Sequence, residues 1–150
     1  MIQSLNKKES AALLANNYIG SLGYVFKGSP FIVPITYFFD GKNTIIVYSS
    51  EGHKTNAMRK NKLVSLHVSE IKNIDNWASV LAHGIFEELS GNDAKRSLYE
   101  FSTGIKDLLL RKEERNLHFI GEFSSKMYKN EIPIVFKITI DEITGKNRIH

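Results

Sequence analysis

The 150-residue chain contains no cysteine. This excludes a disulfide framework, a thiolate nucleophile and a cysteine-based zinc site. The chain also lacks an apolar run long enough to span a bilayer, and its first residues, MIQSLNKKES, are too polar for a signal peptide. We therefore expect a cytoplasmic protein that has no membrane partner.

Several familiar catalytic motifs are absent as well. The sequence has no GxGxxG after a predicted strand, no Walker-type loop, no HExxH and no GxSxG. The five histidines are His53, His67, His83, His118 and His150, and none has a metal-ligand spacing to another histidine or to a carboxylate. We expect no metal site, and the sequence identifies no catalytic residue. His67 and His83 lie among apolar neighbours in predicted strands, which favours structural, hydrogen-bonded roles.

What the chain does contain suits one globular domain over residues 1–150. Its hydrophobic content is 42%, enough for a continuous core at this length. The net charge of +4 permits an acidic ligand. It does not indicate nucleic acid, because the basic residues are interleaved with acids, as in the segment RKEER at residues 111–115.

Hydrophobic periodicity and turn residues predict a mainly β domain of the α+β class. We expect a capping box at Asn6 and Glu9 to open the first helix, an Asp40-Gly41 hairpin turn and a polar loop over Ile71–Asn76. The predicted helices are Leu5–Ile19, His53–Asn61, Ala94–Phe101 and Leu108–Tyr128, and the predicted strands are Leu22–Lys27, Phe31–Phe39, Thr44–Tyr48, Val64–Val68, Trp77–Leu89 and Ile134–Ile143. Six short antiparallel strands of this kind predict a small closed or partly open barrel with helices packed outside.

Two residues inside predicted strands are unusual there. Pro34 cannot donate to a sheet ladder, so it marks an edge, a bulge or a stretch that faces a ligand. Gly84 lies within the long strand Trp77–Leu89, where glycine indicates a bulge or a close backbone approach.

The segment from Thr44 to Val68 reads as strand, short polar loop, helix and strand. Ser49, Ser50, Gly52 and Lys54 gather where the helix begins. Free backbone N–H groups and the positive end of the helix dipole point the same way at such a corner, which suits a phosphate or another anion. An ordinary solvated turn is the alternative interpretation of these residues alone.

The order of these parts along the chain is more informative than any one of them. The parts are the PFIVPITY strand at residues 30–37, the Asp40-Gly41 turn, the Gly52-His53-Lys54 helix start, the WASV strand at 77–80 with Gly84, and the closing segment ITIDEITGK at 138–146. This order resembles that of the flavin-binding split-barrel proteins related to pyridoxamine 5′-phosphate oxidase, most of all the nitroimidazole-resistance (Nim-type) branch. The resemblance extends from the first helix to Lys146.

The resemblance implies a six-stranded antiparallel split barrel that forms a homodimer, with flavin, normally FMN and alternatively FAD, at the subunit interface. It assigns the flavin phosphate to Lys54, with His53 beside it and Ser49 and Ser50 on the phosphate side. The remaining cofactor contacts that it implies are Val33, Pro34, Ile35 and Thr36 beside the isoalloxazine, and Trp77 and Ser79 near the polar edge of the ring.

The resemblance also implies an oxidoreductase that acts on a small organic substrate, with NADH or NADPH as a transient reductant. Two positions depart from the Nim-type pattern: Tyr48 stands where a histidine is common, and Ala78 where an arginine is usual. The particular reaction therefore does not follow from the resemblance. Two alternatives remain, a non-catalytic flavin-binding module and a haem-binding split barrel that uses His67, His83 or His118.

Overall fold

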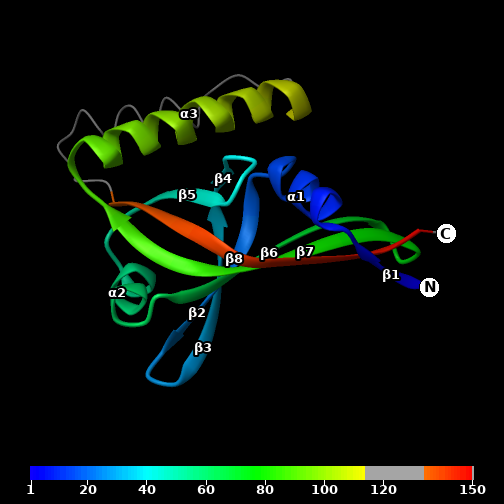
Figure 1. Cartoon of the computed structure of the whole chain (residues 1–150), viewed down its shortest axis with the longest axis horizontal. Coiled ribbons are helices and arrows are strands. Elements are labelled where there is room, and N and C mark those ends of the chain that lie inside the picture. The colour runs from blue at the N-terminus through cyan, green and yellow to red at the C-terminus, as the bar shows by residue number, and fades with distance from the viewer. Residues whose placement is uncertain (114–133, 150) are drawn as a thin grey trace.

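The computed structural model describes residues 1–113 and 134–149. One antiparallel sheet dominates it, with helices on its outer surface (Figure 1). The strands are β1 (Ile2–Leu5), β2 (Ile19–Phe26), β3 (Ser29–Thr36), β4 (Phe38–Phe39), β5 (Thr44–Ser49), β6 (Leu63–Asn73), β7 (Asn76–Leu89) and β8 (Ile134–Arg148). The helices are α1 (Lys7–Ala15), α2 (His53–Lys60) and α3 (Gly91–Glu113).

The sheet curls into a partly open barrel. Its strand order is β3-β2-β6-β7-β8-β5-β4, with β1 paired to the end of β8, and β3 also contacts β5. The expected irregularity at Gly84 is confirmed, because the β7–β8 register shifts between His83 and Gly84. Pro34 lies on β3, which is an edge strand among the described strands, so the edge position is the one of the three alternatives that the structure shows.

Two hydrophobic clusters support this arrangement. The larger one fills the barrel with inward residues of the strands, such as Leu22, Leu66 and Phe136, and is covered by α1 and α2. The smaller one joins α3 to the outer face of β5 and β8 through Phe101, Ile105, Ile46 and Val135. Successive side chains of a strand point to opposite faces, so β5 and β8 contribute alternate residues to the barrel core and to the cluster under α3.

The predicted capping box is confirmed. The Asn6 side chain accepts a hydrogen bond from Glu9 N at 2.8 Å, and Asn6 N donates to the Glu9 carboxylate at 3.1 Å. The predicted turn is confirmed too, since Asp40 Oδ1 accepts from the backbone N–H groups of Lys42 and Thr44.

The fold class is confirmed, but the prediction of six strands is wrong, because the described sheet has eight. The expected strand Phe31–Phe39 is divided into β3 and β4. β1 was not predicted; it has four residues and pairs with the far end of β8. β8 does not end at Ile143, as predicted, but continues to Arg148, and its Gly145 is paired with both Leu5 and Val80. These pairings join distant segments, so local periodicity could not indicate them.

Other boundaries differ from expectation too: the first helix is Lys7–Ala15 and ends before Ile19, where β2 already begins. The predicted loop Ile71–Asn76 is mostly strand, because β6 continues to Asn73 and a short turn leads into β7. The two predicted helices after Gly91 are one, since α3 runs from Gly91 to Glu113; residues 114–128 of the second prediction lie outside the described residues. Gly104 is accommodated within α3 because the Phe38 ring fills the space beside it, where a Cβ atom would stand 2.1 Å from Phe38.

Candidate functional site

The loop between β5 and α2 forms the corner that the sequence predicted. Gly52 is the N-cap of α2 and has no side chain with which to cap it. Thr55 Oγ1 accepts from Gly52 N at 3.0 Å and donates to Gly52 O at 3.1 Å, which stabilises the loop from within. The start of α2 thus keeps its positive dipole end and its first N–H groups available to an anion.

Lys54 supplies the positive charge at this corner. Its side chain is half-buried, and none of the ion pairs found among residues 1–113 and 134–149 involves it. The nearby Arg59, by contrast, is held by Glu51 and Glu88, with an Nη2–Oε2 distance of 2.9 Å to Glu51 and an Nε–Oε1 distance of 2.9 Å to Glu88. Hydrogen bonding from Arg59 lowers the pKa of Glu51. Because Arg59 neutralises Glu51, the charge of Lys54 at the helix start is not offset by Glu51 and can serve a ligand.

The two serines of the corner are not equivalent. Ser49 is the last residue of β5 and is buried, with its Oγ donating to the carbonyl oxygen of Ser50 at 3.3 Å. Ser50 is exposed in the loop itself. Of the two predicted phosphate contacts, Ser50 has the more accessible hydroxyl.

His53 opens α2 and packs against an aromatic surface that the sequence analysis did not identify. Its Nδ1 lies 2.8 Å from the Tyr24 hydroxyl oxygen, within hydrogen-bonding distance. Its ring centroid lies 4.9 Å from that of Phe26 and 4.8 Å from that of Phe31. The aromatic residues on either side of the Lys27-Gly28 turn were the signal in the sequence that could have indicated this cluster.

The four predicted residues of β3 alternate in environment. Ile35 is buried in the barrel core, Val33 packs partly against that core, Thr36 is half-buried and Pro34 is exposed. β3 pairs along one side only, with β2, among the described strands. Its other edge can therefore offer backbone groups to a flat ring system, while the Ile35 side chain serves packing.

Trp77 and Ser79 lie at the opposite end of the molecule. They pair with Arg148 and Lys146 near the end of β8, whereas Arg59 of α2 bonds to Glu88 near the end of β7. Ser79 and Glu88 are nine positions apart on β7, up to roughly 30 Å at the usual rise. Figure 1 shows α2 and the two termini at opposite ends of the sheet. One chain therefore does not bring Ser79 together with Lys54.

The two strand histidines, His67 and His83, are both exposed on the outer face of the barrel. Alternation turns their neighbours Leu66, Val68 and Ala82 inward instead. The expected hydrogen bond is present for His83, whose Nδ1 lies 2.7 Å from Ser65 Oγ. His118 lies outside the described residues.

A hollow of about 520 Å³ lies beside His83 on this outer face, and its lining includes Gly23, Ile32 and Leu63. The side chains of Ile32 and Leu63 are 75% and 66% exposed, and the neighbouring Ile85 is 42% exposed. The outer face of β3, β6 and β7 is thus an apolar surface that no described element covers.

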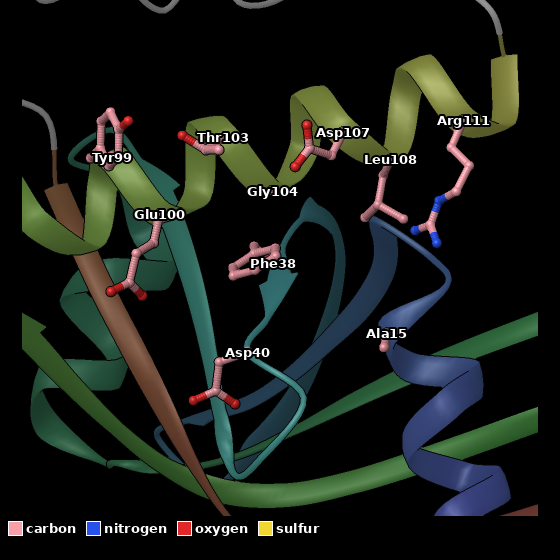
Figure 2. Close-up of a pocket in the computed structure, with 10 residues that line it drawn as sticks. All are labelled: Ala15, Phe38, Asp40, Tyr99, Glu100, Thr103, Gly104, Asp107, Leu108 and Arg111. Atoms are coloured by element: carbon pink, nitrogen blue, oxygen red, sulfur yellow. The ribbon is translucent and has the colours of Figure 1, made fainter.

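A second cavity, of about 500 Å³, lies under α3 (Figure 2). Figure 2 shows Glu100 and Arg111 pointing from α3 toward the sheet and α1, with Phe38 between them and Asp40 below. Its described lining residues include the carboxylates of Asp40, Glu100 and Asp107, with Arg111 as the one cation among them, and none of the ten predicted cofactor residues. This excess of negative charge makes it a poor site for a phosphate.

No helix among the described residues is both long and apolar enough to cross a bilayer. No group of three or more acidic or histidine side chains in that same part of the chain is placed to hold a metal ion.

Comparison with known proteins gives consistent results. Residues 6–147 match the family model described as pyridoxamine 5′-phosphate oxidase. An uncharacterized protein of Rhizobium meliloti is 32% identical over 88 residues, which span 59% of this chain and 58% of that protein.

Solved structures with the same fold include the following two. An FAD-binding protein from Mesorhizobium loti superposes with a TM-score of 0.78 at 22% identity, covering 100% of this chain and 98% of its own. A candidate 5-nitroimidazole antibiotic resistance protein from Bacteroides thetaiotaomicron has a TM-score of 0.70 at 16% identity, covering 98% of this chain and 89% of its own. At these identities the likeness concerns the fold.

Proposed function

Since the chain belongs to the pyridoxamine 5′-phosphate oxidase family, we propose that it is a flavin-dependent oxidoreductase. The observation that carries the proposal is Lys54, a half-buried lysine without a carboxylate partner in the described part of the chain, at a helix start that lacks a side-chain cap. The phosphate next to the ribityl chain is common to FMN and FAD, so the proposal applies to either flavin.

In this proposal the corner binds the flavin phosphate and β3 binds the ring system. Lys54 makes a charge-assisted contact with the phosphate, and the first N–H groups of α2 and the Ser50 hydroxyl donate to its other oxygens. The free edge of β3 at Val33–Thr36 lies along the ring system. A bound flavin supplies the redox chemistry, while the protein supplies orientation and a boundary against water.

The substrate of this site is proposed to be a small organic acceptor such as a nitroaromatic, a nitroimidazole or a quinone. The reductant is NADH or NADPH, which binds transiently. The relative with a nitroimidazole-resistance description supports this class of acceptor. Tyr48, which stands in place of the usual histidine, packs against the cluster under α3. Its side chain is therefore engaged in packing, and no acid or base role is assigned to it.

We also propose that the functional unit is a homodimer with the flavin at its interface. The exposed Ile32, Leu63 and Ile85 of β3, β6 and β7 form an apolar surface, which a second copy would cover. A second copy would also bring its Trp77 and Ser79 to the Lys54 end of the first, which the separation within one chain requires if all the predicted contacts belong to one site. An obligate interface of this kind buries about 2,000 Å² or more.

The test is to purify the protein and record its absorption spectrum, identify the released cofactor, and measure NADH and NADPH oxidation with a nitroaromatic and a quinone. A flavin spectrum with acceptor-dependent turnover is the expected result. A flavin spectrum without turnover would support the binding-module alternative. A Soret band instead of flavin absorption would overturn the proposal in favour of haem.

A further inference from the structure

The hollow beside His83 is built on one row of paired residues across the outer face of the barrel. Ile32 of β3 pairs with Gly23 of β2, and Gly23 pairs with Ser65 of β6. Ser65 in turn pairs with His83 of β7. Residues that are paired across antiparallel strands have their side chains on the same face of the sheet. The strand register therefore sets these residues side by side, and all of them line the hollow.

The walls of the hollow are mostly apolar. Pro30, Ile32 and Leu63 belong to its lining, and Gly23 has no side chain to fill the space between them. A Cβ atom on Gly23 would meet its nearest atom at 3.8 Å, so the glycine leaves open room. The volume of about 520 Å³ lies within the roughly 300–1,000 Å³ that is typical of small-molecule sites. The hollow therefore suits a small, flat, apolar molecule.

A hydrogen-bonded pair gives the hollow its polar group. His83 is exposed, and its Nδ1 lies 2.7 Å from Ser65 Oγ. When Nδ1 donates to Ser65, the imidazole is held in one orientation and Nε2 is left for a ligand. Asp141, at the β7–β8 bulge, also lines the hollow but has no partner in the strand register. Histidine is the side chain that most often transfers a proton in general acid–base catalysis. An oriented imidazole in an apolar hollow fits an aromatic molecule whose oxygen takes up a proton.

The hollow adjoins both parts of the proposed flavin site. Its β3 residues, 30–32, are followed directly by Val33–Thr36, where the ring system is proposed to lie. The Phe31 ring, which also belongs to the lining, has its centroid 4.8 Å from that of His53, the residue before Lys54. A molecule in the hollow would therefore lie beside the flavin and not in its place.

We infer that the hollow binds the aromatic acceptor and that His83 donates a proton to it. The inference rests on the proposed function. Reduction of a quinone to a hydroquinone takes up one hydride equivalent, which comes from NADH through the flavin, and one further proton. His83 Nε2 gives that proton to the quinone oxygen, Nδ1–H stays bonded to Ser65, and the neutral imidazole regains a proton from water. A second copy lying over Ile32 and Leu63 would close the hollow and exclude water from the acceptor.

The first test follows the reoxidation of the full-length, flavin-bound protein after reduction by NADH without oxygen. p-Benzoquinone needs a proton to become hydroquinone, whereas ferricyanide accepts an electron and needs none. His83→Gln keeps a group that can bond to Ser65 but cannot deliver a proton. It should slow reoxidation by benzoquinone roughly hundredfold, the low end of the range for general acid–base catalysis. Reoxidation by ferricyanide should not change, which also shows that the variant is folded and holds its flavin.

His67→Gln is the matched control for this variant. His67 is an exposed histidine on the same face of the barrel, where it pairs with Leu81, and it lies outside the lining of the hollow. The substitution should alter neither rate.

The second test measures occupancy of the hollow without turnover. Gly23→Val fills the open space with a side chain that suits a strand. The affinity of the oxidised, flavin-bound protein for hydroquinone, measured by calorimetry, should fall roughly tenfold or more. Flavin affinity should stay as in the parent, and this shows that the variant is folded.

Three outcomes would overturn the inference while the flavin site stands. His83→Gln could leave the benzoquinone rate unchanged, or slow benzoquinone and ferricyanide equally, and His83 would then not be the proton donor. Gly23→Val could leave hydroquinone affinity unchanged, which would place the acceptor elsewhere. Either variant could weaken flavin binding itself, which would assign the hollow to the flavin ring. A parent protein that holds no flavin, or holds it without reducing benzoquinone, would instead overturn the proposed function.

Discussion

Gly84 of β7 lies so close to Thr139 of β8 that a Cβ atom on Gly84 would stand 2.4 Å from the Thr139 carbonyl oxygen. Real Cβ atoms do not approach backbone that closely, so only glycine fits here without movement of the sheet. The contact coincides with the register shift between His83 and Gly84, where the strand bends. The bend at Gly84 therefore contributes to the curling of the sheet into a barrel.

Gly84→Ala should lower the free energy of unfolding by about 1–3 kcal/mol, because β8 must move to admit the methyl group. Chemical denaturation measures the change. Gly23→Ala is a matched control within a strand, since an added Cβ there meets its nearest atom at 3.8 Å. Its effect should be small or slightly stabilising. Equal losses in the two variants would contradict the steric explanation.

Lys54→Ala should weaken FMN binding roughly ten- to hundredfold, since hydrogen bonds to charged groups contribute about 1.5–3 kcal/mol. Calorimetric titration of the flavin-free protein measures it. Riboflavin lacks the phosphate, so its weaker binding should hardly respond to the substitution. Lys62→Ala removes an exposed lysine beyond the far end of α2 and should affect neither ligand. If the Lys54 variant bound FMN as tightly as the parent, the phosphate would have to lie elsewhere.

Leu63→Asp should dissociate the proposed dimer, because it places a charge in the apolar outer face where Leu63 is 66% exposed. Light scattering at micromolar concentration distinguishes the two states. Ile74→Asp changes an even more exposed residue, at 80%, in the turn between β6 and β7, and should leave the dimer intact. A parent protein that is monomeric with flavin bound would refute the dimer.

Tyr37 should make the free energy of unfolding depend on pH in the alkaline range. Burial, with a smaller contribution from the charge of Glu70, raises the pKa of the Tyr37 hydroxyl, which donates to the Leu14 carbonyl oxygen at 2.7 Å. In the unfolded chain the phenol ionises near its ordinary pKa of about 10. The stabilisation is therefore complete below that pH and falls as the pH rises above it, because only the unfolded state then loses the proton.

Tyr37→Phe tests this. The variant should be about 1 kcal/mol less stable at neutral pH, since it loses a buried hydrogen bond. Between pH 9 and 11.5 its unfolding free energy should decline less steeply than that of the parent. Denaturant titrations across this range provide the measurement. Parallel pH profiles for the two proteins would show that Tyr37 does not control the alkaline response.

Features decided by neighbouring residues were predictable from the sequence. The Asn6–Glu9 capping box, the Asp40 turn and the start of α2 at His53 all depend on hydrogen bonds between residues at most four positions apart. The fold class was predictable too, because alternating apolar residues and turn signals specify antiparallel strands whatever their partners. The corner of Ser50, Gly52 and Lys54 belongs with these, since it lies within one loop and one helix start.

Only the tertiary structure decided which distant segments meet. The pairing of β1 with the end of β8, the continuity of α3 past Gly104 and the aromatic cluster at His53 each depend on contacts between residues far apart in the chain. The sequence placed Lys54 and Ser79 in one site, but the strand register puts them at opposite ends of the sheet. Local propensity acts over a few residues, whereas register and packing are set by the burial of whole faces. The residues of the corner itself could therefore be predicted from the sequence, whereas the distant segments that pack around it could not.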